Sequence, residues 1–259
     1  MLLNSVILVL REVLEAAMVV SLFMAFTTVS QQSRRFLIKA ILLGLIAGAT
    51  YAYFLPEVSN WLEGVGQEIT NTAIHIGIYC CLTVFLWLIS RDINLPNQLV
   101  KGMMMTAIIL AISRESAEIM LYISGFRSDH FLMQSVLSGS LIGLGIGVSC
   151  GIFLYHLMIA LKPAPAAKCI CILVVIVGSS MMSQATQFLI QADWLASSNP
   201  VWDSSHLISE HSLPGQLLYA LMAYEATPTW SQILVYLTSL LLMLIVIVSG
   251  RFSRSIQHD

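Results

Sequence analysis

Long runs of apolar residues alternate with shorter polar connections along most of this chain. A helix that crosses a bilayer needs about 20 consecutive, mainly apolar residues. Runs near that length predict seven spans, at residues 3–26, 37–55, 72–90, 103–124, 131–160, 169–191 and 230–250. The pattern therefore predicts an all-α integral membrane protein with seven transmembrane helices in a single domain, residues 1–259.

The composition agrees with a membrane protein and argues against a soluble one. The chain is 58% hydrophobic and only 10% charged, whereas soluble proteins carry about 25% charged residues. Its formal net charge of −2 provides no basic surface for nucleic acid. The lipid bilayer is the environment that this composition fits.

The polar connections carry charges of alternating sign. The first, third and fifth connections and the C-terminal tail are basic, with Arg34, Arg35, Lys39, Arg91, Lys101, Lys162, Lys168, Arg251 and Arg254. The other connections are mainly acidic, with Glu57, Glu63, Glu68, Asp129, Asp193, Asp203, Glu210 and Glu225. Because Lys and Arg concentrate on the cytoplasmic side of membrane proteins, we predict an outer N-terminus and a cytoplasmic C-terminus in the cell membrane.

The pattern Arg-Glu-x-x-Glu interrupts two of the apolar runs. It occurs as Arg11–Glu15 in the first predicted span and as Arg114–Glu118 in the fourth. One charge at the bilayer centre costs roughly 2.5–3.5 kcal/mol, so six unpaired charges would cost about 15–20 kcal/mol. Ionisable residues at such depth usually mark an ion pathway, and the pair of motifs therefore indicates a transporter.

The two motifs lie in spans of opposite direction. Spans one to three (1–91) and four to six (101–191) are candidate inverted repeats, which would form a shared site near the midplane. The segment 192–229 is then an outer loop with an interfacial helix in LPGQLLYALMAY, and 230–250 is an added seventh span. Glycines every four residues in the fifth span predict close helix packing, at Gly139, Gly143, Gly147 and Gly151.

Within each motif the two glutamates share one face of the helix, because residues three and four apart are neighbours. The candidate metal ligands are Glu12, Glu15, Glu115 and Glu118, and Arg11 and Arg114 would hold them ionised and oriented. Carboxylate oxygens suit hard cations such as iron, manganese, calcium and magnesium. An acidic outer surface raises the local cation concentration, so a possible outer access route runs past Glu57, Glu63 and Glu68.

Other interpretations stay open from the residues alone. The charged clusters could be structural salt bridges, the transported ion could be another divalent cation such as manganese, and the acidic loops could be ordinary solvated loops. An intramembrane enzyme or a membrane scaffold that binds a partner are further alternatives. Histidines on or near the outer side could bind a transition metal or only support the structure, at His75, His130, His206 and His211.

Three segments resemble the oxidase-dependent iron permease family, which comprises fungal high-affinity iron permeases and bacterial Efe-type iron permeases. LREVLEAAMVV resembles the first-helix signature of that family, and SRESAEIMLYISG resembles the fourth. VWDSSHLISEHSLPGQLLYALMAYEATPTW resembles the region before its last helix. The resemblance implies iron import across the cytoplasmic membrane, with Fe(III) as the favoured form and iron as substrate rather than cofactor.

The same resemblance implies the roles of individual residues and a partner. It assigns metal binding to Glu12, Glu15, Glu115 and Glu118, supported by Arg11 and Arg114. It also implies an extracytoplasmic protein that oxidises or delivers iron, no enzymatic activity, and leaves a homo-oligomer open. The sequence departs from the family where a second acidic pair often precedes the third helix: Glu68 matches, but Asn71 and Thr72 replace Glu-Gly.

Overall fold

The computed structural model describes residues 1–91, 98–210 and 212–256. Over these residues the chain folds into eight α-helices and one short 3₁₀ helix, η1 (Trp61–Gly64). The α-helices are α1 (Leu2–Val29), α2 (Arg35–Ser59), α3 (Gly66–Arg91), α4 (Gln98–Ser124), α5 (His130–Ala160), α6 (Pro163–Gln191), α7 (Leu213–Met222) and α8 (Trp230–Ile256).

Each predicted span lies within one of the seven long helices. Five of these helices are long and apolar enough to cross a membrane, namely α2, α3, α5, α6 and α8. The other two, α1 and α4, each contain one three-charge motif. The helical fold and the apolar spans agree with the expected all-α membrane protein.

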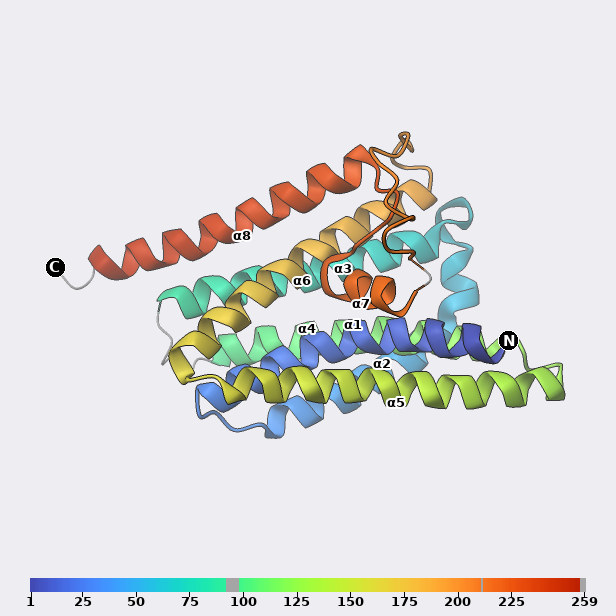
Figure 1. Ribbon diagram of the computed structural model, residues 1–259, viewed down its shortest axis with the longest axis horizontal. Helices are drawn as coiled ribbons and strands as arrows, with labels where there is room; N and C mark the ends of the chain where they lie inside the picture. Colours follow the sequence, from blue (N-terminus) through green and yellow to red (C-terminus); the bar gives the residue numbers. More distant parts are fainter. Residues whose placement is uncertain (92–97, 211, 257–259) are drawn as a thin grey trace.

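The long helices run along one another in pairs. α1 packs against α5, α2 packs against α4, and α3 packs against α6, while α8 covers α3 and α6. Figure 1 shows α8 along one edge of the bundle and α5 with α2 along the opposite edge. Edge-to-face contacts of Phe23 and Phe26 with Phe85 help to fill the core between α1 and α3.

Glycines permit the closest of these helix contacts, as the sequence predicted. A Cβ atom on Gly139, Gly143, Gly147 or Gly151 of α5 would meet atoms of α1 at 2.6–2.9 Å. On the other side of the bundle, Gly44 and Gly48 of α2 lie equally close to α4. Small residues thus bring α1 and α4 each against a partner helix without intervening side chains.

The connections gather at two ends of the bundle (Figure 1). The α1–α2 and α5–α6 connections lie at the same end as the C-terminal part of α8. The α2–α3 and α4–α5 connections, the segment between α6 and α8, and the N-terminus lie at the other end. The basic connections 30–34 and 161–162 are therefore separated from the acidic segments along the whole length of the helices.

A short helix forms within the 192–229 segment, where the sequence predicted one. The Ser212 side chain accepts a hydrogen bond from the Gly215 amide, and Pro214 occupies the first turn, both typical of a helix start. Ala223 ends α7 in the left-handed conformation. Ala220 of this helix packs on Leu10 and Leu14, so α7 covers the part of α1 that carries the first motif.

Candidate metal site

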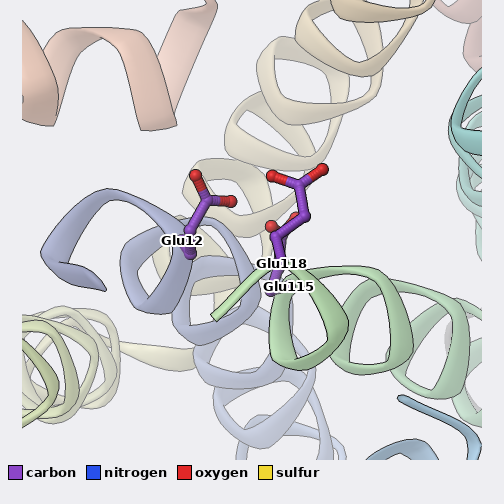
Figure 2. Close-up of side chains that lie close together, drawn as sticks. All are labelled: Glu12, Glu115 and Glu118. Atoms are coloured by element: carbon purple, nitrogen blue, oxygen red, sulfur yellow. The ribbon is translucent and has the colours of Figure 1, made fainter. Parts of the chain in front are cut away.

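The two charged motifs face each other where α1 and α4 pack together. Figure 2 shows Glu12 of α1 pointing toward Glu115 and Glu118 of α4. One carboxylate oxygen from each of these three residues lies within 4.8 Å of the others. Glu12 and Glu115 are buried and Glu118 is partly exposed. Three carboxylates from two helices thus converge on one point.

The Arg114 guanidinium lies at the centre of this cluster and contacts all four motif carboxylates. Its Nη1 is 2.7 Å from Glu115 Oε1, 3.2 Å from Glu15 Oε2 and 3.8 Å from Glu12 Oε2. Its Nη2 is 2.9 Å from Glu118 Oε1. Only 2% of its side chain is exposed, so a desolvated cation already occupies the point where the carboxylates meet.

The equivalent arginine of the first motif has a different environment. Arg11 Nε lies 3.6 Å from Glu15 and 4.0 Å from Glu12, and 33% of the side chain is exposed. Its guanidinium carbon sits 3.8 Å from the centre of the Tyr219 ring of α7, a cation–π contact. Arg11 therefore pairs within its own motif, as the spacing predicted, whereas Arg114 also reaches across to the other motif.

Two buried carboxylate oxygens keep capacity for a further ligand. Glu12 Oε2 and Glu15 Oε1 accept no hydrogen bond from the described part of the chain. Their nearest cationic groups are Arg114 Nη1, 3.8 Å from Glu12 Oε2, and Arg11 Nε, 3.6 Å from Glu15 Oε1, both beyond hydrogen-bonding distance. A buried oxygen that accepts no hydrogen bond is costly, and a bound metal ion would remove that cost. Four carboxylates and two guanidiniums leave a formal charge of −2, so the cluster has charge and donor atoms for a hard cation.

A cavity of about 360 Å³ adjoins the cluster. Its lining includes Glu12 and Glu118 together with Glu68 and Asn71 of α3. Glu68 Oε2 is buried and accepts no hydrogen bond from the described residues. Because Glu68 lies in the first turn of α3, at the end of the bundle that carries the acidic segments, the cavity leads from that end toward the motifs.

The chain was also compared with known proteins. It matches the family described as "Iron permease FTR1 family" over residues 2–256, almost its whole length. The chain belongs to this family. Membership confirms the family resemblance seen in the sequence and means that the protein is an iron permease of the membrane.

Curated relatives of this permease agree with the family match. Proteins named "Ferrous iron permease EfeU" from Escherichia coli O6:H1 and Yersinia pestis are each 23% identical to it over 262 and 260 residues. These alignments cover 93% of the chain and 94% and 91% of the relatives. A protein of that name from Shigella sonnei is 23% identical and is covered at 89%. No solved structure matches the chain.

Asn71 of the permease, where the sequence departs from the family pattern, contacts the charged cluster directly. Its Nδ2 donates a hydrogen bond to Glu118 Oε1 at 3.1 Å, and its Oδ1 accepts one from the Tyr51 hydroxyl at 3.1 Å. Tyr51 was not singled out from the sequence, where nothing distinguishes it from the neighbouring Thr50 and Tyr53 of α2. The amide thus orients a carboxylate instead of adding one.

The other acidic residues of the expected access route lie away from the cavity. Glu57 is exposed near the end of α2, and Glu63 is exposed in η1 with a left-handed backbone. Of Glu57, Glu63 and Glu68, only Glu68 is among the described residues that line the cavity. The structure therefore separates Glu68 from Glu57 and Glu63, which the sequence had grouped together.

The two candidate histidines whose side chains the structure describes, His75 and His206, do not join the carboxylate cluster. His75 is fully buried between α3 and α6, with Nδ1 2.8 Å from the Asn71 carbonyl and Nε2 2.9 Å from the Gln184 side chain. His206 is exposed in the 192–229 segment. His211 and the side chain of His130 lie outside the described residues. His75 thus contacts the backbone of Asn71 and the side chain of Gln184. These contacts favour a structural role for His75 over metal binding.

Proposed function

We propose that this permease imports iron across the cytoplasmic membrane through a site formed by the two Arg-Glu-x-x-Glu motifs. The observation that carries the proposal is the position of Arg114, within 4.0 Å of carboxylates from both motifs. A point that already accommodates a cation among Glu12, Glu15, Glu115 and Glu118 suits a metal ion. Iron would then displace the guanidinium and take its carboxylate partners.

The proposal includes a crossing of the membrane by all seven long helices, with the N-terminus outside and the C-terminus in the cytoplasm. The buried ion pairs of α1 and α4 support this, because charges that pair inside a bundle are compatible with a membrane span. The separation of basic and acidic connections at opposite ends supports the orientation. In this arrangement the motifs lie near the midplane.

An inverted repeat of α1–α3 and α4–α6 accounts for how the motifs meet. Glu12 and Glu115 are 103 positions apart, and the residues of α1 and α4 that face glycines of a partner helix follow the same offset. Gly143 and Gly147 lie against Val9 and Val13 of α1, while Gly44 and Gly48 lie against Ile112 and Ser116 of α4. Val9 plus 103 is Ile112, and Val13 plus 103 is Ser116, so the two pairs use corresponding residues of α1 and α4. The glycines themselves are 99 positions apart, so the partner helix of one pair is shifted by four residues, about one helical turn, relative to the other.

For the access route we propose the cavity beside Glu68, with Glu57 and Glu63 as part of the acidic outer surface. A negatively charged outer surface concentrates cations. An extracytoplasmic protein that oxidises or delivers iron remains a prediction from the family. In the proposed route iron passes Glu68 and then reaches Glu118, which is the most exposed carboxylate of the cluster.

We propose Fe(III) as the transported form, since the converging donors are all oxygens of hard carboxylates. The names of the relatives concern ferrous iron and point to Fe(II) as the competing form. Uptake into proteoliposomes should be measured with radioactive ferric citrate and, separately, with iron kept reduced by ascorbate. Faster uptake of the ferric form is expected, and uptake confined to the reduced form would overturn this assignment.

The site itself is tested by uptake into the same proteoliposomes. Glu12→Gln/Glu115→Gln should lower the initial rate at least tenfold, since even loss of a residue that only supports a metal ligand costs roughly 10–100-fold. Asp193→Asn, an equally conservative change at an exposed carboxylate, should leave the rate unchanged. Manganese and copper are added as competitors. Equal uptake by the double variant and the wild type would exclude the site, and stronger competition by manganese than by unlabelled iron would favour a manganese transporter.

A further inference from the structure

A second cavity, of about 590 Å³, lies between the α1–α5 pair and the α2–α4 pair. Its lining residues are almost all aliphatic, and several on the rim are exposed at the surface of the bundle: Leu45, Met120, Leu144, Val148 and Ile152. Buried side chains such as Ile112 form its floor. We call this space the lateral groove, and in the proposed membrane placement it opens toward the hydrocarbon of the bilayer.

The few polar groups in the lateral groove are satisfied elsewhere. Ser21 Oγ donates to the Met18 carbonyl at 3.0 Å, and Ser116 Oγ donates to the Ile112 carbonyl at 2.6 Å. The Glu115 carboxylate is turned to Arg114, 2.7 Å away. The Tyr155 hydroxyl lies 3.3 Å from Thr28 Oγ1. These walls offer a polar solute few hydrogen bonds, so the groove suits a hydrocarbon chain.

The length of the groove fits one leaflet of the bilayer. Along α1 the lining extends from Val13 to Met24, which is about 16 Å at 1.5 Å per residue. Half of the hydrocarbon core is about 15 Å thick. A single acyl chain that runs parallel to α1 would therefore extend from the level of the charged motifs to the edge of the bilayer.

Basic residues mark the end of the groove that lies at the α1–α2 connection. Tyr155 lines that end, and the Arg34 guanidinium carbon is 5.7 Å from the centre of its ring. Arg34 shares the face of α2 that carries the groove residues Ile41 and Leu45, whereas Arg35 and Lys39 follow on a neighbouring face. All three basic side chains are exposed. Basic pockets between helices on the cytoplasmic side are suited to anionic head groups.

We propose that the lateral groove binds an anionic phospholipid, with one acyl chain between α1 and α4 and its phosphate at Arg34, where Arg35 and Lys39 add positive charge at the same end of the groove. The inference rests on the proposed membrane placement of the helices but not on iron transport. The acyl chain would pack against the back of Glu115 and Ser116, and would fill a space that the helices leave open. This assigns the basic first connection a ligand in addition to its role in topology.

Native mass spectrometry of the detergent-purified full chain tests this site. The wild type should retain one phosphatidylglycerol in preference to phosphatidylethanolamine. Arg34→Gln/Arg35→Gln/Lys39→Gln should lose at least about tenfold in affinity for phosphatidylglycerol, given the usual contribution of each basic residue near a lipid surface. Arg91→Gln/Lys101→Gln/Lys168→Gln, with equal loss of charge, should bind as the wild type does.

A substitution that fills the groove tests the binding of the acyl chain separately from the binding of the head group. Val20→Trp should weaken binding of both lipids, whereas Leu241→Trp, at an exposed position of α8 outside the groove, should not. Equal retention of the two lipids by the wild type and by the basic-cluster variant would overturn the proposal. So would a dimer cross-linked through Val148→Cys, because a second copy would then cover the groove. Neither readout requires iron flux.

Discussion

At the scale of single residues, the unequal environments of the two motif arginines determine what each one does. Arg114 is surrounded by four carboxylates, and a planar guanidinium with five N–H donors can serve several of them at once. Arg11 serves one motif and stacks on Tyr219 at a partly exposed position. The motifs share one pattern of charged residues, and their surroundings differ in that α7 packs on α1, which carries the first motif.

Replacement of each arginine by glutamine should therefore give different losses of stability. Arg114→Gln leaves buried carboxylates unpaired, a change that costs about 3–5 kcal/mol. Arg11→Gln should cost about 1 kcal/mol, because the Arg11 side chain is partly exposed and Glu15 keeps Arg114 as a partner. The free energy of unfolding in detergent measures both. Equal losses in the two variants would contradict the central position of Arg114.

Some of these residue positions follow from the sequence and others do not. Helical spacing predicted that Glu12 lies beside Glu15 and Glu115 beside Glu118, and the hypothesis of an inverted repeat predicted that the two pairs face each other. Whether the Arg114 guanidinium contacts the carboxylates of α1 depends on its rotamer and on side-chain packing. The spacing of residues along a helix predicts neither. The stacking of Tyr219 on Arg11 depends on how the 192–229 segment folds back, which its length and composition leave undetermined.

At the scale of the elements, the contact between α1 and α5 depends on glycines whose surroundings differ from one position to the next. A Cβ on Gly143 would lie 2.6 Å from the Val6 carbonyl and 3.0 Å from the Leu10 amide, both backbone atoms. A Cβ on Gly145 would meet nothing within 4 Å. The two glycines therefore form a matched pair for testing the packing of α1.

Gly143→Ala should destabilise the protein by about 1–3 kcal/mol, the usual cost of overpacking. Gly145→Ala should be neutral or stabilise it by up to about 1 kcal/mol, since alanine favours the helix. Thermal unfolding in detergent distinguishes the two. If both variants unfolded at the same temperature, the close contact of α5 with α1 would be wrong.

The attachment of the 192–229 segment to α8 should depend on pH through Glu225. Its carboxylate accepts hydrogen bonds from Gln232 at 2.8 and 2.7 Å, and burial raises the pKa of Glu225 above its ordinary value. The folded state thus favours the protonated form, and this stabilisation is lost as the pH rises through the raised pKa. The melting temperature of the wild type relative to Glu225→Gln should fall over that pH range.

Asp203 in the same segment provides a control of opposite sign. Hydrogen bonds from the Ser205 hydroxyl and amide lower the pKa of Asp203. Its contribution is present above the pKa of the unfolded chain and is lost as the pH falls through the lowered pKa. The melting temperature of the wild type relative to Asp203→Asn should therefore fall toward acid pH. If the two melting-temperature differences changed with pH in the same direction, the environments described for Glu225 and Asp203 would be wrong.

At the scale of the whole molecule, the sequence predicted the helices well because long apolar runs leave few alternatives. Each predicted span lies within one helix, and the helices extend beyond the spans where polar residues continue them, as at Gly66–Asn71 of α3. The groove between the α1–α5 and α2–α4 pairs could not be predicted in this way. It depends on how pairs of helices meet, and hydropathy reports only that each helix is apolar.

The proposed orientation predicts which connections face the outside of the cell. In a background with the five native cysteines replaced by serine, Asp193→Cys should react with a membrane-impermeant maleimide on intact cells. Ser33→Cys, in the basic connection between α1 and α2, should react only after the membrane is permeabilised. The opposite result would invert the topology, and labelling of both positions on intact cells would exclude seven crossings.

The central claim is that iron binds between the motifs of α1 and α4 through carboxylate oxygens. Iron K-edge X-ray absorption of the purified, iron-loaded protein tests it most directly, with bound iron counted in the same samples. We predict a coordination shell of oxygen ligands without sulfur, and loss of the bound iron in Glu12→Gln/Glu115→Gln but not in Asp193→Asn. Sulfur in the shell, or an unchanged iron content and spectrum in the double variant, would contradict the account.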